Sequence, residues 1–269
     1  RYLYRPVDLD ALNLEGASAP ALLDAAALLG FNAFNITHPC KQSVVEHLHE
    51  LSDAAHALGA VNCVVIREDG TFYGDNTDHS GFISGLQRGL PQVAGNLARL
   101  ERVIQLGAGA AGSATAYALC TLGVRHLSLY EQDAAKATGL AEQPGELFLQ
   151  TQIEVLTSTE ELIHALHEAQ GLVNATPVGM HVHPGMPLNE SVQAAGVLRE
   201  GLWVADVIYL PQETALIRAA RSAGCEVLTG GYMAVGQAVD AFRLFTGIEP
   251  NAERMAAHFE RLIKAQQGV

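Results

Sequence analysis

Lys41 and Asp78 are the charged residues of this chain whose surroundings best suit proton transfer. Lys41 ends the segment Asn35–Lys41, which reads NITHPCK, and Asp78 ends Gly74–Asp78, which reads GDNTD. Each segment follows the end of a predicted strand. A lysine with a carboxylate partner can hold, accept and return a proton at a hydroxyl group, which the oxidation of an alcohol requires. The pair therefore predicts a proton relay for alcohol dehydrogenation.

Two further segments carry polar residues at predicted strand ends, Gly59–Asn62 and Asn174–Pro177. Ligands of open α/β sheets bind outside the carboxyl ends of the strands, so these segments indicate a ligand site. Taken alone, Lys41 suits a solvated position at a helix start, and Asp78 suits the N-cap of a following helix. The four segments together favour the ligand site over these two alternatives.

A glycine-rich turn follows the apolar strand Val103–Leu106 and reads Gly107-Ala108-Gly109-Ala110-Ala111-Gly112. In a G-x-G-x-x-G turn the first glycine permits a tight turn, the second lets the backbone approach a pyrophosphate, and the third lets helix and strand pack closely. The following helix offers N–H groups and the positive end of its dipole to the phosphates. The context predicts a dinucleotide site, against the alternative of an ordinary strand-to-helix turn.

Glu131 follows the next predicted strand, His126–Tyr130, at the distance where an acid should bind the adenosine ribose. A carboxylate there accepts a hydrogen bond from a 2′-hydroxyl and repels a 2′-phosphate. Gln132 and Asp133 come next, and the first basic residue is Lys136. These residues predict NAD rather than NADP. The alternative, that the acids merely begin a helix at 133–142, is compatible with that prediction.

The elements that must position these residues alternate between strand and helix. Apolar runs predict strands at 103–106, 126–130, 153–156, 171–174, 203–208 and 226–228. Helical patterns lie between them at 113–122, 159–169 and 213–223. Alternation of this kind predicts a parallel sheet with helices on both faces.

The first third of the chain predicts a smaller α/β unit. We expect helices at 19–29, 41–58 and 80–89, a strand at 33–36, and a hairpin around Asp69-Gly70. Residues 91–100 read as a linker, and the last helices, 232–245 and 251–266, are expected to close back onto the first domain. The fold class is therefore α/β with two domains. Residues 1–92 with 234–269 form a substrate domain with a mainly parallel sheet, and residues 93–233 form a Rossmann-type NAD-binding domain.

Composition excludes several classes of protein. The 269 residues are 49% hydrophobic and 17% charged, and the net charge is −13 without any basic run, which disfavours nucleic acid and anionic membranes as partners. The uncharged stretch 103–124 is interrupted by polar residues and glycines, so it predicts strand, turn and helix rather than a membrane span. Four cysteines without metal-like spacing indicate a cytoplasmic protein with reduced thiols. His181 and His183 lack a third ligand nearby, so we expect no metal.

Six short motifs occur in an order that resembles the shikimate dehydrogenase family over nearly the full length of the chain. They are NITHPCK, GAVN, GDNTD, NATPVGM, VADVIYLPQET and GGYMAVGQAVDAF. The resemblance implies oxidation of a ring hydroxyl on a hydroxylated cyclohexane or cyclohexene carboxylate, such as shikimate or quinate, to the 3-dehydro ketone.

The resemblance also implies roles for individual residues. The catalytic pair falls on Lys41 and Asp78, and the substrate contacts fall on Thr37, Asn62, Tyr209 and Gln237. The cofactor contacts fall on Gly107, Ala108, Gly109, Ala110, Ala111, Glu131, Thr176, Val207, Gly230 and Met233. Taken alone, Gln237 suits an amphipathic helix and Met233 suits a core position.

Two departures from the family pattern bear on specificity. Biosynthetic members usually carry Asn-Arg-Thr where this chain has Glu131-Gln132-Asp133, which favours the NAD-linked quinate/shikimate branch. The family's N-terminal serine-rich substrate motif has no counterpart here, which leaves the substrate open.

Three alternative functions follow. The chain could act on an amino-substituted shikimate, or on a folate derivative, although one Trp and seven Tyr show no clustered aromatic slot. It could also be a catalytically silent NAD sensor, against which the retention of Lys41 and Asp78 argues. We expect a small-molecule substrate as partner and a monomer or homodimer.

Overall fold

The computed structural model describes residues 2–267, which form two compact units that divide between Asn76 and Thr77. The sequence pattern placed helix 80–89 and the last helices with the first domain. The second unit contains those helices together with the large sheet. The predicted domain boundaries, 1–92 with 234–269 and 93–233, stay a prediction about which residues serve substrate and which serve cofactor.

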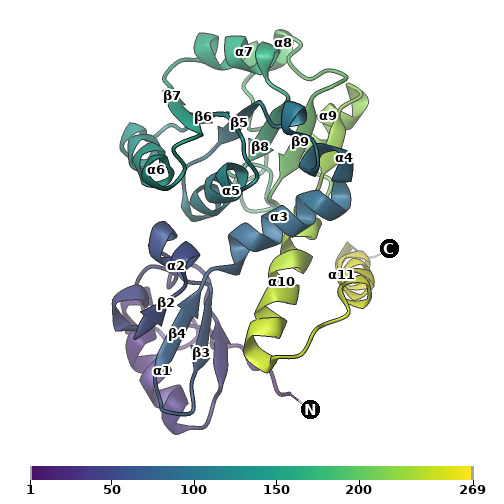
Figure 1. Ribbon diagram of the computed structural model, residues 1–269. Helices are drawn as coiled ribbons and strands as arrows, with labels where there is room; N and C mark the ends of the chain where they lie inside the picture. The colour runs from purple at the N-terminus through teal and green to yellow at the C-terminus, as the bar shows by residue number, and fades with distance from the viewer. Residues whose placement is uncertain (1, 268–269) are drawn as a thin grey trace. The chain divides into compact units, whose positions relative to one another are not determined.

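The first unit is a four-stranded sheet with short helices (Figure 1). Its strands follow the order β1-β3-β4-β2. In chain order its elements are η1 (Gly16–Ser18), α1 (Ala19–Leu28), β1 (Ala33–Asn35), η2 (Val45–His47), β2 (Glu50–Leu51), α2 (Asp53–Leu58), β3 (Cys63–Ile66) and β4 (Phe72–Asp75).

The expectation that this sheet would be mainly parallel is wrong. β1 pairs antiparallel with β3, β3 pairs antiparallel with β4, and β2 pairs parallel with β4. The hairpin between β3 and β4 fixes this arrangement, because Gly70 turns the chain at φ +83° and Asp69 Oδ1 accepts the Thr71 N–H at 2.9 Å. A two-strand hairpin must be antiparallel, and here it forms the centre of the sheet.

The expectation of one helix over 41–58 is also wrong. The backbone of this segment bonds to β4, since His49 N–H donates to Phe72 O at 3.0 Å and Ser52 N–H donates to Gly74 O at 2.9 Å. Ser52 then begins α2, where its hydroxyl accepts the Ala55 N–H at 3.1 Å. The apolar period of the segment comes from turn, strand and helix in succession, each of which packs against the same core.

The second unit contains a six-stranded sheet in the order β10-β9-β8-β5-β6-β7, and all five strand pairs are parallel. The six strands predicted from sequence are confirmed. They are β5 (Arg102–Leu106), β6 (His126–Tyr130), β7 (Gln152–Leu156), β8 (Gly171–Asn174), β9 (Trp203–Asp206) and β10 (Glu226–Leu228).

Helices cover both faces of this sheet (Figure 1). Val103 packs with α3, α5 and α6 on one face, and its neighbour Ile104 packs with α7, α8 and α9 on the other. The helices are α3 (Thr77–Gly89), α4 (Pro91–Ala94), η3 (Leu97–Arg99), α5 (Ala110–Thr121), α6 (Ala134–Leu147), α7 (Thr159–Glu168), α8 (Glu190–Ala194), α9 (Ala215–Ser222), α10 (Gly230–Thr246) and α11 (Ala252–Gln267). The segment 91–100, expected as a linker, thus contains two short helices.

α3 and α10 cross at two glycines. A Cβ atom on Gly81 would lie 2.6 Å from Gln237 N, and one on Gly236 would lie 2.6 Å from Gly81 O. Ser80 Oγ donates to Asp240 Oδ2 at 2.6 Å beside this crossing. The two backbones therefore approach more closely than any larger residue would allow.

Candidate functional site

The glycine-rich turn lies at the carboxyl end of β5, at the centre of the parallel sheet. Gly107 has φ +96°, and a Cβ atom there would lie 2.9 Å from the carbonyl carbon of Ala175. A Cβ atom on Gly112 would collide with the carbonyl oxygen of Gly107. The fold itself therefore requires the first and third glycines of the motif.

The second glycine differs from the other two. Gly109 is the N-cap of α5, and a Cβ atom on it would meet nothing within 4 Å among the described residues. The first N–H groups of an α-helix have no acceptor within the helix. Gly109, Ala110 and Ala111 thus present backbone donors beside open space, which is the arrangement that a diphosphate needs.

Gln105 holds this turn from inside the sheet. Its side chain is fully buried, and its Nε2 donates to both Gly107 O and Gly112 O at 2.9 Å. Its Oε1 accepts the hydroxyl of Thr115 at 2.8 Å. Sequence reasoning missed this residue, although a polar side chain in an otherwise apolar strand directly before the glycines was a signal for it.

Glu131 extends from the end of β6 back to the glycine-rich turn. Its Oε2 accepts the Ala108 N–H at 2.9 Å, and its Oε1 accepts the Asp133 N–H at 3.1 Å. Asp133 also accepts the Ala135 N–H at the start of α6 and lies 3.7 Å from the Lys136 ammonium. The local charge after β6 is therefore negative, as the NAD prediction requires.

The carboxyl ends of β8 and β9 are joined by side-chain hydrogen bonds. Asn174 and Asp206 are register partners, and Asn174 Nδ2 donates to Asp206 Oδ1 at 3.1 Å. Asn174 Oδ1 accepts both the N–H of Thr176, at 3.1 Å, and its hydroxyl, at 2.7 Å. The Thr176 hydroxyl oxygen in turn accepts the Val178 N–H at 3.2 Å. The NATPV segment is thus a folded turn rather than a loose loop.

Asp206 is the buried acid of this region. Its side chain accepts hydrogen bonds from the Thr214 hydroxyl at 2.7 Å and the Ile208 N–H at 3.1 Å, besides the one from Asn174. Burial raises the pKa of Asp206 to about 6, and the three hydrogen bonds oppose that rise. Sequence reasoning did not select Asp206, because the predicted strand extended to residue 208, whereas β9 ends at Asp206 as β8 ends at Asn174.

The remaining predicted cofactor residues lie beside this network. A Cβ atom on Gly230 would collide with the carbonyl oxygens of Val207 and Ile208, so only glycine lets α10 begin there. Met233 lies on α10 and packs in the core, the position that this residue suits when it is taken alone. Since Leu106 is in register with Tyr130 and Asn174, all these strand ends lie along one edge of the sheet. The structure thereby brings the predicted cofactor residues together.

Two predicted substrate contacts lie in the second unit. Gln237 Nε2 donates to Ala234 O at 3.1 Å, and Gln237 O accepts the Thr77 hydroxyl at 3.2 Å. Tyr209 is 47% exposed, and its ring centroid lies 6.3 Å from that of Phe259. Asp78 lies in the first turn of α3, inside the helix rather than at its N-cap.

The first unit brings Thr37, Lys41 and Asn62 together. Ile36 N–H donates to Asn62 O at 2.7 Å, and Val61 N–H donates to Lys41 O at 2.8 Å. These bonds place the NITHPCK segment alongside GAVN. Lys41 belongs to the first unit and Asp78 to the second, so their predicted partnership stays a prediction.

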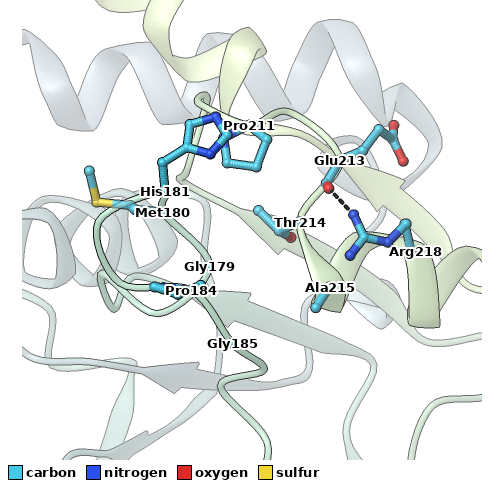
Figure 2. A pocket seen from close by; sticks show the side chains of 10 residues that line it. All are labelled: Gly179, Met180, His181, Pro184, Gly185, Pro211, Glu213, Thr214, Ala215 and Arg218. Carbon is cyan, nitrogen blue, oxygen red and sulfur yellow. Dashed lines mark hydrogen bonds between the residues drawn. The ribbon is translucent and has the colours of Figure 1, made fainter. Parts of the chain in front are cut away.

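A pocket of about 190 Å³ lies next to the same strand ends in the second unit (Figure 2). The loop that follows β8 contributes His181, and the loop before α9 contributes Pro211 and Thr214. Arg218 donates to Glu213 O on its rim (Figure 2). Among residues 2–267 no group of three or more His, Cys, Asp or Glu side chains could hold a metal ion, and no helix is long and apolar enough to cross a membrane.

Family models match both ends of the chain. The model described as the shikimate dehydrogenase substrate binding domain matches residues 2–64, and that of the shikimate 5'-dehydrogenase C-terminal domain matches residues 232–258.

Two relatives match along almost the whole chain. A shikimate dehydrogenase (NADP(+)) of Arthrobacter sp. (strain FB24) is 53% identical over 267 residues, which cover 99% of this chain and 87% of that protein. A quinate/shikimate dehydrogenase (NAD(+)) of Corynebacterium efficiens is 46% identical over 259 residues, 96% of this chain and 87% of that one. Both cofactor names therefore occur among similar proteins.

The fold matches as well as the sequence. The structure of quinate dehydrogenase from Corynebacterium glutamicum in complex with NAD superposes with a TM-score of 0.82 at 45% identity, covering 90% of this chain and 82% of that chain.

Proposed function

The chain belongs to the shikimate dehydrogenase family, and from that premise we propose that it oxidises a ring hydroxyl of shikimate or quinate with NAD. In this reaction the carbinol C–H leaves as hydride, the O–H proton goes to the protein, and the alcohol becomes the 3-dehydro ketone. NAD, when bound, supplies the hydride acceptor. The observation that carries the proposal is the Glu131 carboxylate bonded to the Ala108 N–H within the glycine-rich turn.

The choice of NAD rests on local charge. A 2′-phosphate at the end of β6 would meet the carboxylates of Glu131 and Asp133, and the neighbouring cation, Lys136, already pairs with Asp133. A 2′-hydroxyl in the same place would find an acceptor in Glu131, which two backbone N–H groups orient. The adenosine ribose of NAD fits this environment, and that of NADP does not.

We assign proton transfer to Lys41 with Asp78 as its partner. The backbone bonds between the Lys41 and Asn62 segments support a shared substrate surface in the first unit. Thr37 and Asn62 would bind ring hydroxyls there, Gln237 on α10 would bind another, and Tyr209 would lie near the substrate carboxylate. Residues 1–92 with 234–269 would serve the substrate, and residues 93–233 would serve the cofactor.

Steady-state kinetics test the proposal. The protein should oxidise shikimate or quinate with a higher kcat/KM for NAD than for NADP, and Glu131→Ala should narrow that ratio. Asp133→Ala separates the two causes, because it removes an acid and releases Lys136 but keeps the ribose acceptor: it should raise kcat/KM for NADP and leave kcat/KM for NAD unchanged. A kcat/KM for NADP equal to or above that for NAD would reject the cofactor assignment, and the absence of turnover with both acids would reject the substrate class.

The predicted cytoplasmic location and the monomeric or homodimeric state stay predictions. Size-exclusion chromatography with light scattering decides the oligomeric state.

A further inference from the structure

Asp206 is buried and hydrogen-bonded, yet it is none of the proposed catalytic, substrate-binding or cofactor-binding residues. It is 2% exposed, and it accepts hydrogen bonds from three different segments. Asn174 lies at the end of β8, Ile208 lies in the loop after β9, and Thr214 lies at the N-cap of α9. Burial of a carboxylate costs free energy that hydrogen bonds offset only in part here, because the pKa of Asp206 stays raised despite its three hydrogen bonds.

The three partners extend to the residues that would contact the cofactor. Asn174 uses its other amide atom to hold the N–H and hydroxyl of Thr176. Val207 lies between Asp206 and Ile208, both of which the carboxylate fixes. Gly230 packs directly on the carbonyl oxygens of Val207 and Ile208. One carboxylate thus sets the positions of two loops and the start of α10.

We propose that Asp206 is a positioning residue that holds Thr176 and Val207 for the nicotinamide half of the cofactor and leaves the adenosine half unaffected. This inference rests on the proposed function, because that function makes Thr176 and Val207 cofactor contacts. The adenosine ribose would lie at Glu131 after β6, and the diphosphate would lie at the glycine-rich turn after β5. Because β8 and β9 lie on the other side of β5 from β6, Thr176 and Val207 would meet the nicotinamide half.

Ionised Asp206 accepts all three hydrogen bonds, whereas the protonated acid must donate its own O–H and so loses one acceptor position. Neutral groups face it from β8, from the loop after β9 and from α9, namely Asn174, Ile208 N–H and Thr214. The nearby acid Glu213 is exposed and pairs with Arg221 at 2.8 Å. Since burial raises the pKa of Asp206 to about 6, protonation should occur within an accessible pH range.

The test compares two ligands that differ only in nicotinamide. Calorimetric titrations with NAD and with ADP-ribose are made between pH 5.0 and 8.0 on the whole protein. The dissociation constant for NAD should rise about fivefold from pH 7.5 to 5.0, which corresponds to the loss of about one hydrogen bond. The constant for ADP-ribose should change less than about twofold, and this ligand controls for pH effects that arise away from the nicotinamide.

Variants separate positioning from folding. Asp206→Asn keeps the shape and donates to the Thr214 oxygen as the protonated acid would, so its affinity for NAD should be low and independent of pH. Thr214→Val removes a donor to the carboxylate, so the midpoint of the pH-dependent change in the NAD dissociation constant should move to higher pH. Thr214→Ser should restore the wild-type midpoint. Glu131→Gln is the matched control at the adenosine end, and it should weaken NAD and ADP-ribose alike.

Two results would overturn the proposal. One is an Asp206→Asn protein with the pH profile of the wild type, and the other is an equal pH-dependent loss of NAD and ADP-ribose binding. These titrations need no substrate, so absent turnover with shikimate and quinate counts against the proposed function alone. If NADP binds more tightly than NAD, NADP and 2′-phospho-ADP-ribose make the same comparison.

Discussion

The sheet edge that would hold the cofactor has two halves, which are built in different ways. The steric half is the glycine-rich turn after β5, and the ionic half is the pair of loops after β8 and β9. In the turn after β5, backbone geometry dominates: Gly107 and Gly112 have no room for a side chain, and neutral Gln105 fixes the turn. At the ends of β8 and β9, a buried carboxylate holds the loops through side chains. Steric constraints do not change with pH, whereas a network around an acid does. The conformation of the steric half should therefore be independent of pH, and that of the ionic half should change with pH.

Lys41→Ala should have the largest effect and should leave both halves of the edge intact. Turnover should fall about 10²-fold or more, because general acid–base catalysis contributes about 10² to 10⁴. The dissociation constant for NAD should stay unchanged, since Lys41 belongs to the first unit. Stopped-flow kinetics measures the turnover, and calorimetry measures the dissociation constant for NAD. Turnover of the variant at the wild-type rate would show that Lys41 takes no part in the mechanism.

Gly107→Ala should destabilise the glycine-rich turn, which is the steric half. The residue has φ +96° and its Cβ would lie 2.9 Å from Ala175 C, so we expect a loss of about 3 kcal/mol in the free energy of unfolding. Gly109→Ala is the matched control, because the protein offers room for its Cβ. That variant should fold as the wild type but bind NAD at least about tenfold more weakly. Urea unfolding and calorimetry measure both quantities, and equal destabilisation by the two variants would contradict this account.

Asp206→Asn tests the ionic half, because it should change the pH dependence of the free energy of unfolding. The raised pKa means that the folded protein keeps the Asp206 proton where the unfolded chain, with a pKa near 3.8, releases it. Ionisation of Asp206 therefore costs stability between about pH 4 and pH 6, and a rise of this size corresponds to about 3 kcal/mol. The free energy of unfolding of the variant, relative to that of wild type, should rise over that range and stay constant above pH 7.

Urea unfolding at half-unit pH intervals measures this difference. Thr214→Ser, which keeps the carboxylate and its hydroxyl partner, should show the wild-type pH dependence. A difference between Asp206→Asn and wild type that does not vary with pH would show that Asp206 titrates alike in the folded and unfolded chains.

Gln105→Leu should give the smallest effect, about 2 kcal/mol of destabilisation. Leucine fills a similar volume but leaves two buried carbonyl oxygens and the Thr115 hydroxyl with one partner fewer each. The loss should be the same at pH 5 and pH 8, in contrast to Asp206→Asn. Thermal unfolding at both pH values checks this, and a pH-dependent loss would undermine the distinction between the two halves.

Much of the second unit could be predicted from the sequence, because its signals are local. An apolar run bounded by a glycine-rich turn defines β5, and five further runs defined the other strands of the parallel sheet. The first unit was harder, since the apolar period over 41–58 suits a helix on its own. Pairing of this segment with β4 overrides that preference, and β4 lies some 20 residues further along the chain.

The networks inside the site could be predicted only in part. Glu131 follows a strand end, and its position relative to the glycine motif identified it, whereas Thr176 was identified through the resemblance of NATPVGM to the family pattern. Asp206 acquires its role from Asn174, 32 residues earlier, and from Thr214, 8 residues later. Hydrogen bonds between segments that far apart leave no periodic trace in the sequence.

The close crossing of α3 and α10 has a consequence for protein engineering. A chimera that exchanges residues 93–233 for those of a relative would take Gly230 and Met233 from the donor and Gln237 from the recipient, all on one helix. Because Gly81 and Gly236 leave no room for side chains between the helices, the donor turns of α10 must continue in the same helical phase. Grafts of residues 77–246 transfer α3 and α10 together with Glu131, so they avoid this seam and should carry the cofactor preference with them.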